Sequence, residues 1–194
     1  MNVQNKILYH ISRKINWNKG DKLVIGENEN PFWNFSKNYS PQYLVNGQPI
    51  PVFQMFEQFS NFDLTQDNIN FLYQVLKDVS KETAFCIREQ VFENIRKEFY
   101  PDLPSRQKCL WLTDKEQLPY WKTMAENTQR AVLTLEINGT IFCADDTWLT
   151  ANTFSSQEYT ERAHHYWSGE MTSTPRQEYL FCGRALVKEI SLIQ

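Results

Sequence analysis

The chain has 194 residues, of which 41% are hydrophobic and 14% are aromatic, while only six are glycine. This size and composition are typical of one globular domain with a real core, so we expect a single domain over residues 1–194. The formal charge of -3 gives no general basis for a nucleic-acid-binding or membrane-binding surface.

Neither a targeting segment nor a membrane-spanning segment is expected. Residues 1–6 are polar, and no apolar run approaches the length of a signal-sequence core or a membrane helix. We therefore expect a cytoplasmic protein without membrane contact. No two cysteines form a C-x-x-C pair, so free thiols in a reducing compartment are predicted and a zinc site is not. The cysteines are Cys86, Cys109, Cys143 and Cys182.

Two short strands and a long loop are predicted first along the chain. Ile7–Ile11 is apolar enough for a strand, and Lys22–Gly26 is a second extended piece after a turn. From Glu27 to Pro51 the chain is rich in Asn, Pro, Gly and aromatic residues without clear periodicity. We expect a long loop that packs by its aromatic side chains, and loops of this length are often functional.

Two helices are predicted in the middle of the chain. Thr65 begins a capping sequence, and the apolar face of the first helix follows it. A second helix starts after Ser80 and is closed by Pro101. The apolar positions of the first helix are Ile69, Leu72, Tyr73, Leu76 and Val79.

Further short strands are predicted in the C-terminal half. Cys109–Leu112 is expected to be a buried strand that leads into a short aromatic helix. Ala131–Ile137 alternates between apolar and polar residues, and Asn138-Gly139 is typical of a hairpin turn before the return strand Thr140–Ala144.

The chain is predicted to end with a helix and a β-hairpin. The helix begins at Ser155 and stops at Gly169, while Pro175–Ile190 indicates two strands around a turn that contains Gly183. In total, six or seven short strands are expected, with the helices concentrated between the second and third. This order predicts an α+β fold.

Common catalytic signatures are absent, including glycine-rich phosphate loops, the G-x-S-x-G elbow and the H-E-x-x-H zinc motif. His164 and His165 would point about 100° apart on a helix, so no shared metal ion is expected. Glu178, at the front edge of a predicted strand, is either a solvated strand end or a placed catalytic group. His10, taken alone, is a core histidine or a functional one.

Three segments in this order carry a resemblance to a known group of enzymes. They are Tyr9-His10-Ile11-Ser12, then Leu110-Trp111-Leu112-Thr113-Asp114 with the aromatic pair that follows, and finally Glu178-Tyr179-Leu180-Phe181. Together they resemble the ADP-ribosyltransferase superfamily, in its His-Tyr-Glu branch of diphtheria-toxin-like and poly-ADP-ribose-polymerase-like enzymes. The chain is also similar to a small uncharacterised bacterial family (DUF2441-like) grouped with it, through Pro104-Ser105-Arg106 and Tyr166-Trp167-Ser168-Gly169.

The resemblance implies a fold and an activity. The implied fold is a split β-sandwich of two small antiparallel sheets, with helices inserted after the N-terminal strands. The implied reaction is cleavage of the nicotinamide–ribose bond of NAD, the only cofactor expected, through an oxocarbenium-like transition state without a metal. Glu178 would stabilise the developing positive charge at the ribose, as an electrostatic catalyst.

The resemblance also implies the residues that bind NAD. His10 would hydrogen-bond the ribose and hold the cofactor, and Ser12 would support it or contact the nicotinamide ribose. Trp111 and Tyr120 would stack on either side of the nicotinamide ring. Trp121 is the alternative to Tyr120. Either Arg13 or Arg106 would neutralise the pyrophosphate, because guanidinium groups match phosphate oxygens.

The implied biological role is that of a bacterial or phage toxin or defence effector. Its acceptor would be a protein or a nucleic acid, and a cytoplasmic toxin would imply an antitoxin protein as a partner. Arg176, two residues before Glu178, gives no support to acidic recognition of an arginine acceptor. Two alternatives stay open, namely an NAD glycohydrolase with water as the acceptor and a non-catalytic binding module.

Overall fold

The computed structural model describes residues 1–45, 47–59, 63–125 and 129–193. In this part of the chain it has five α-helices and two antiparallel sheets, so the predicted α+β class is confirmed. The elements in chain order are β1 (Asn2–Ser12), β2 (Lys22–Ile25), α1 (Pro31–Lys37), β3 (Gln42–Val45), β4 (Gln48–Pro51), α2 (Val52–Phe59), α3 (Gln66–Phe99), β5 (Leu110–Leu112), α4 (Leu118–Thr123), β6 (Arg130–Asp145), the 3-10 turn η1 (Asp146–Leu149), α5 (Ser156–Ser168) and β7 (Gln177–Ile193).

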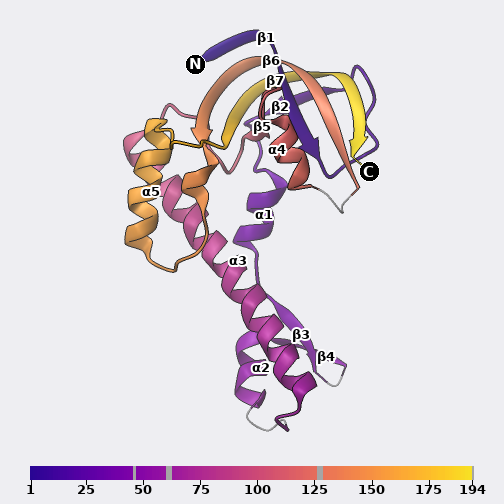
Figure 1. Cartoon of the computed structure of the whole chain (residues 1–194), viewed down its shortest axis with the longest axis vertical. Coiled ribbons are helices and arrows are strands. Elements are labelled where there is room, and N and C mark those ends of the chain that lie inside the picture. The colour runs from indigo at the N-terminus through magenta and orange to yellow at the C-terminus, as the bar shows by residue number, and fades with distance from the viewer. Residues whose placement is uncertain (46, 60–62, 126–128, 194) are drawn as a thin grey trace.

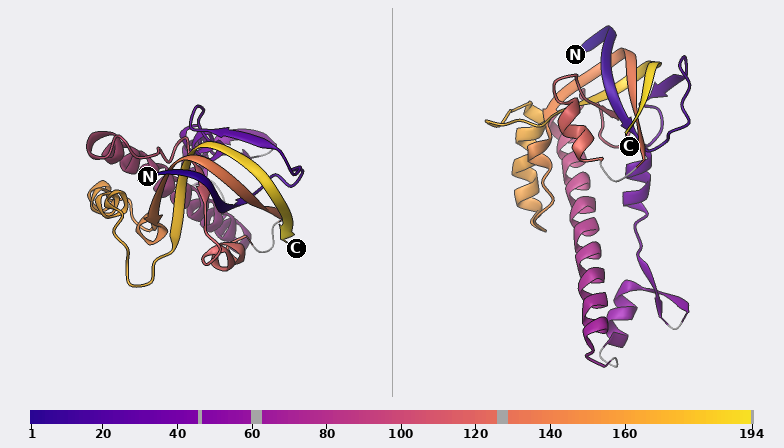
Figure 2. Two further views of the ribbon diagram at one scale, coloured as in Figure 1. Left: turned by 90° about the horizontal axis from the view of Figure 1, so that it is seen from above. Right: turned by 45° about the vertical axis from the view of Figure 1, so that its right-hand side comes forward.

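A strongly curved sheet forms one end of the molecule, and a helical arm projects from it (Figure 1). The sheet has the strand order β1-β6-β7-β2, and β5 pairs with β7 beside β2. Tyr9 and Thr113 then exchange two backbone hydrogen bonds of 2.8 Å, which join the free edge of β1 to the end of β5. The sheet therefore bends round on itself, as the view from above shows (Figure 2).

The two predicted hairpins are wrong, because β6 and β7 are each one continuous strand. They pair with each other over their whole lengths, from Arg130 opposite Ile193 to Asp145 opposite Gln177. Gly139 and Gly183 lie opposite each other in the middle of this pair. A Cβ on Gly139 would lie 2.3 Å from the carbonyl oxygen of Cys182, so glycine is needed here for close backbone approach rather than for a turn.

The sheet core is built by alternating side chains, as the sequence predicted for β6. Leu133, Leu135 and Ile137 are fully buried, whereas Thr134 and Glu136 are half-buried. These three join a buried cluster with side chains of β1, β5 and β7, and each fully buried side chain of this size contributes roughly 1.5–3 kcal/mol. A second cluster, which includes Phe92, Tyr159, Tyr166, Trp167 and Leu180, packs α3 and α5 against the sheet.

The two helices predicted on either side of Ser80 are one helix of 34 residues, α3. Its N-cap is confirmed, because the Thr65 hydroxyl accepts a hydrogen bond from the Asn68 amide at 3.3 Å. No Pro or Gly occurs between the two ends, so nothing in the sequence stops the helix at Ser80. The C-terminal half of α3 packs beside α5, and its N-terminal half forms the arm (Figure 1).

The predicted loop from Glu27 to Pro51 is also wrong, because it holds α1, β3 and β4. Asn30 caps α1 by accepting a hydrogen bond from the Trp33 amide at 2.9 Å, and Pro31 occupies the first helical turn. Elements this short show too few residues for periodicity to reveal them. No helix in the described ranges is long and apolar enough to cross a membrane.

Candidate active site

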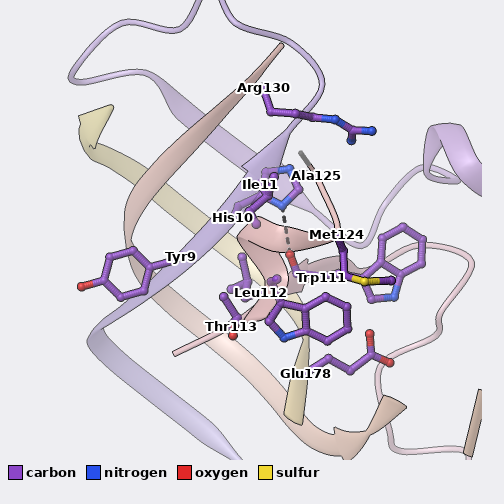
Figure 3. Close-up of a pocket in the computed structure, with 11 residues that line it drawn as sticks. Tyr9, His10, Ile11, Trp111, Leu112, Thr113, Met124, Ala125, Arg130 and Glu178 are labelled. Atoms are coloured by element: carbon purple, nitrogen blue, oxygen red, sulfur yellow. Dashed lines mark hydrogen bonds between the residues drawn. The ribbon is translucent and has the colours of Figure 1, made fainter. Parts of the chain in front are cut away.

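A cavity of ≈ 220 Å³ opens between β1, β5, α4 and the start of β7. Its lining includes His10, Trp111 and Glu178, which come from three segments far apart in the sequence (Figure 3). Trp121 also lines the cavity, whereas Tyr120 does not. The aromatic helix after β5 therefore contributes Trp121, which the resemblance left as the alternative to Tyr120.

His10 is held by the contact that closes the sheet. Its Nδ1 lies 2.9 Å from the carbonyl oxygen of Trp111, one residue beyond the bridge between Tyr9 and Thr113 (Figure 3). Burial lowers the pKa of His10 below 6.5, and the bond to Trp111 only partly opposes this effect. The imidazole is then neutral at pH 7, and because a carbonyl only accepts, Nδ1 carries the proton. Nε2 is left as a hydrogen-bond acceptor.

Glu178 is buried at the start of β7 and is fixed by two donors. Arg106 Nη1 donates to its Oε1 at 2.6 Å, and the Tyr166 hydroxyl donates to the same oxygen at 2.7 Å. Only 6% of Glu178 is exposed, so this carboxylate is not the solvated strand end that its position alone allowed. A buried carboxylate that faces a cavity and is held by a guanidinium is typical of a functional site.

The support for Glu178 continues into α3. Arg106 Nε donates to Glu89 Oε2 at 3.1 Å, and Arg88 Nη2 donates to Glu89 Oε1 at 2.6 Å. All of these side chains are at least 90% buried. The network therefore connects the long helix to the carboxylate at the cavity, and its charges are paired as buried charges must be.

The two tryptophans that line the cavity are held by contacts with residues outside its lining. The Trp121 indole donates to the carbonyl of Gln177 at 3.0 Å, and the Trp111 ring packs edge-on to Phe32 with 5.6 Å between centroids. The indole nitrogen of Trp111 is buried and has no hydrogen-bond partner in the described residues. The Tyr120 ring packs edge-on against Trp121, and the Tyr120 hydroxyl accepts a hydrogen bond from Arg176 at 3.3 Å.

Three other predicted binding residues lie outside the cavity lining. Ser12 is buried, and its hydroxyl accepts hydrogen bonds from the Lys14 amide at 3.1 Å and the Trp17 indole at 3.0 Å. Arg13 is exposed. Arg106 is buried in the network described above, so its guanidinium is engaged by carboxylates within the fold.

Arg130 is a cavity residue that the sequence did not predict. It stands at the first position of β6, and in the close-up it lies at the opposite end of the cavity from Glu178 (Figure 3). Burial lowers its pKa, and the neighbouring charge of Arg13 lowers it further. Nothing in the local sequence marks Arg130, because only the folding of β6 against β1 brings it to the cavity.

Asp146 is a second acidic group near Glu178 that the sequence did not single out. Burial and the charge of Glu178 raise the pKa of Asp146 to about 6. Its carboxylate lies 3.3 Å from Arg176 Nη2, and its backbone amide donates to the Arg176 carbonyl at 2.9 Å. Within the described residues, no group of three or more His, Cys, Asp or Glu side chains is arranged to hold a metal ion.

Together, the fold and cavity define an α+β protein. A neutral histidine, two tryptophans and a glutamate held by hydrogen bonds line one small cavity. Residues 8–192 match the model of the family described as "Protein of unknown function (DUF2441)". The chain therefore belongs to this family, as its resemblance to a DUF2441-like family indicated. A search of curated proteins gives no match.

Proposed function

We propose that the protein is an NAD-dependent ADP-ribosyltransferase. The observation that carries this proposal is that His10, Trp111 and Glu178 line one cavity (Figure 3). These are the residues that the His-Tyr-Glu pattern singled out from three separate segments. The closure of the sheet between β1 and β5 supports the finer fold assignment, a split β-sandwich like that of the ADP-ribosyltransferases.

The cavity suits the nicotinamide riboside half of NAD. At ≈ 220 Å³ it is smaller than the roughly 300–1,000 Å³ of typical ligand pockets, so the adenosine half extends outside it. Trp111 and Trp121 supply flat surfaces on which the nicotinamide ring stacks. A ribose hydroxyl donates to Nε2 of His10, which is the acceptor in the neutral tautomer.

Glu178 acts on the charge that develops at the ribose. As the bond between ribose C1′ and the nicotinamide nitrogen breaks, its electron pair goes to the nicotinamide and positive charge grows on the sugar. The carboxylate stabilises that charge and accepts a hydrogen bond from the 2′-hydroxyl through Oε2. The acceptor then forms a bond to C1′ and releases a proton.

The arginines take different roles from those that the sequence suggested. Arg106 positions Glu178 and does not bind the pyrophosphate, because it is buried between two carboxylates. Arg130 lies at the opposite end of the cavity and supplies a cationic group for the pyrophosphate, and the exposed Arg13 adds positive charge near it. Ser12 supports the backbone after His10 through its hydrogen bonds.

The test is to incubate the protein with NAD labelled in the adenosine half and to measure nicotinamide release. We expect turnover that Glu178→Gln reduces by at least a hundredfold, since one electrostatic group of this kind contributes about 10²–10³ in rate. The control is Glu170→Gln, which removes an exposed carboxylate bonded to His165. No turnover with cell lysate as acceptor, or equal turnover in both variants, excludes the enzyme and leaves the non-catalytic module.

The same assay separates a transferase from an NAD glycohydrolase. A transferase moves the label onto protein or nucleic acid, and digestion with protease or nuclease then names the class of acceptor. A glycohydrolase releases free ADP-ribose at the same rate as nicotinamide. The toxin or defence role, and with it an antitoxin, follows only if the labelled acceptor is essential to the host cell.

A further inference from the structure

One face of α3 is apolar but uncovered. Ile69, Tyr73 and Leu76 follow one another at spacings of four and three residues, which places them on one stripe of the helix. Their exposed fractions are 45%, 66% and 45%. We call these three residues the arm stripe. The sequence marks it as an apolar helix face, and the fold leaves it open to solvent.

The arm that carries this stripe projects away from the sheet. It consists of β3, β4, α2 and the N-terminal half of α3, and none of the other helices in the described ranges lies beside its outer end (Figures 1 and 2). Its own core is a small cluster centred on Val52, Met55 and Val75. Additional large apolar side chains on the arm are exposed, namely Leu44 (72%), Phe53 (74%) and Leu64 (82%). Exposed apolar side chains gathered in this way indicate an interaction surface.

The charge of the arm decides which partner fits. Residues 38–82 contain five carboxylates and only two cationic side chains, Lys77 and Lys81, so the arm carries net negative charge. A nucleic acid or an anionic membrane needs a cationic surface, which this segment does not offer. A second copy of the chain would bring like-charged arms together. A basic partner is attracted by the same carboxylates.

We propose that the arm stripe docks a basic amphipathic helix of a partner protein. Apolar residues of that helix pack against Ile69, Tyr73 and Leu76, whose spacing matches the anchors of helix-to-helix recognition. Its Lys and Arg residues lie near Asp63 and Asp67, which are exposed at the start of α3. This inference is independent of the reaction proposed for the cavity.

The test uses the full chain and two designed peptides of 18 residues. One peptide places leucine at helical spacing on a lysine background, and the other replaces every lysine with glutamate. We expect fluorescence anisotropy to show binding of the lysine peptide that weakens with added salt. The double variant Tyr73→Gln/Leu76→Gln should bind it at least tenfold more weakly. Glutamine keeps the helix propensity, and the replaced side chains are exposed, so the variant is expected to fold.

The matched control is Phe154→Gln, which removes an exposed aromatic side chain (59%) outside the arm and should leave binding unchanged. Absence of lysine-peptide binding, equal affinity for the two peptides, or equal affinity of the double variant and the control would each overturn the proposal. Light scattering and flotation with phosphatidylglycerol vesicles complete the test. A dimer or vesicle binding that the double variant abolishes would overturn it in favour of a second copy or a lipid surface.

Discussion

Glu178 shows how one residue depends on a chain of buried contacts. Its carboxylate is held by Arg106 and Tyr166, and Arg106 is in turn held by Glu89 on α3. The guanidinium therefore compensates two buried carboxylates at once. Taking such charges out of water costs several kcal/mol for each ion, so removal of their partner is expected to be far more harmful than loss of a surface ion pair.

Replacement of Arg106 by Met should lower the free energy of unfolding by about 3–5 kcal/mol, because it leaves the buried carboxylate of Glu178 without its ion-pair partner. The measurement is urea denaturation at pH 7. Adding Glu178→Gln to this variant should restore part of the loss, since the unpaired charge is then removed, whereas Glu89 keeps its pair with Arg88. The control is Arg162→Met, which breaks the more exposed pair with Glu158 and should cost about 1 kcal/mol or less. Similar losses in the two arginine variants would contradict the network.

Asp146 should lower the stability of the folded protein as the pH rises, which is the reverse of the usual effect of a carboxylate. Its pKa of about 6 lies above the ordinary value of 3.8, so the folded state binds the proton more tightly than the unfolded state between these values. The charged form therefore penalises folding above pH 6, and the penalty disappears as the pH falls below 3.8. The difference between these two pKa values corresponds to about 3 kcal/mol in the free energy of unfolding. Asp146→Asn should accordingly gain stability relative to the unmodified protein as the pH rises from 4 to 8.

The neighbouring Asp145 provides the opposite case as a control. Burial acts to raise its pKa, but hydrogen bonds from Thr172 and Thr147 outweigh burial and lower the pKa below the ordinary value. Its stabilisation is present above pH 3.8 and is lost as the pH falls through the folded-state pKa. Asp145→Asn should therefore be less stable than the unmodified protein by a nearly constant amount from pH 4 to 8, and the difference should shrink only below pH 3.8. Parallel pH profiles for the two variants would refute the assignment for Asp146.

At the scale of elements, the pairing of β6 with β7 decides the local structure. Asn138-Gly139 is a strong hairpin signal, yet Gly139 lies in mid-strand opposite Gly183. The local signal failed because a partner strand 44 residues further along the chain supplies backbone hydrogen bonds over the whole of β6. The glycine is still required, but for backbone approach and for its φ of +152°.

Gly139→Ala should therefore destabilise the protein by about 3 kcal/mol or more, from overpacking and backbone strain together. Gly20→Ala is the matched control, because Gly20 also has a positive φ (+94°) but has open space around the position of a Cβ. It should cost only about 1–2 kcal/mol. Thermal unfolding of both variants gives the comparison. If both variants lost the same stability, the contact of the added Cβ with the Cys182 carbonyl would not account for the cost at Gly139.

The sequence predicted those parts of the fold and site that local patterns encode. The alternation in β6 and the cap at Thr65 depend on nearby residues. The three segments that line the cavity were singled out by their resemblance to the motifs of a known group of enzymes. Arg130 and the continuity of the long strands depend on contacts between distant segments, so no local pattern could reveal them. The break predicted at Ser80 was wrong because neither Pro nor Gly ends the helix there.

At the scale of the whole molecule, α3 spans two regions that differ in the size of the core they pack against. Its C-terminal half is packed in the large cluster around Phe92 and carries Glu89, which supports Arg106 beside the cavity. Its N-terminal half is joined to α2, β3 and β4 mainly by the small cluster of Val52, Met55 and Val75. The same helix therefore connects a well-packed site to an arm with little core of its own.

Backbone amides of the arm should consequently exchange with solvent before those of the sheet. Local opening of α2 and the first part of α3 exposes few buried side chains, whereas opening of β6 and β7 requires loss of the main core. We expect exchange at least tenfold faster for amides in residues 63–76 than for those in 131–144, as followed by mass spectrometry of peptic fragments. Within α3, protection should rise from Val75 towards Phe92. Uniform protection along the whole helix would contradict this gradient and would mean that the arm is held as firmly as the sheet.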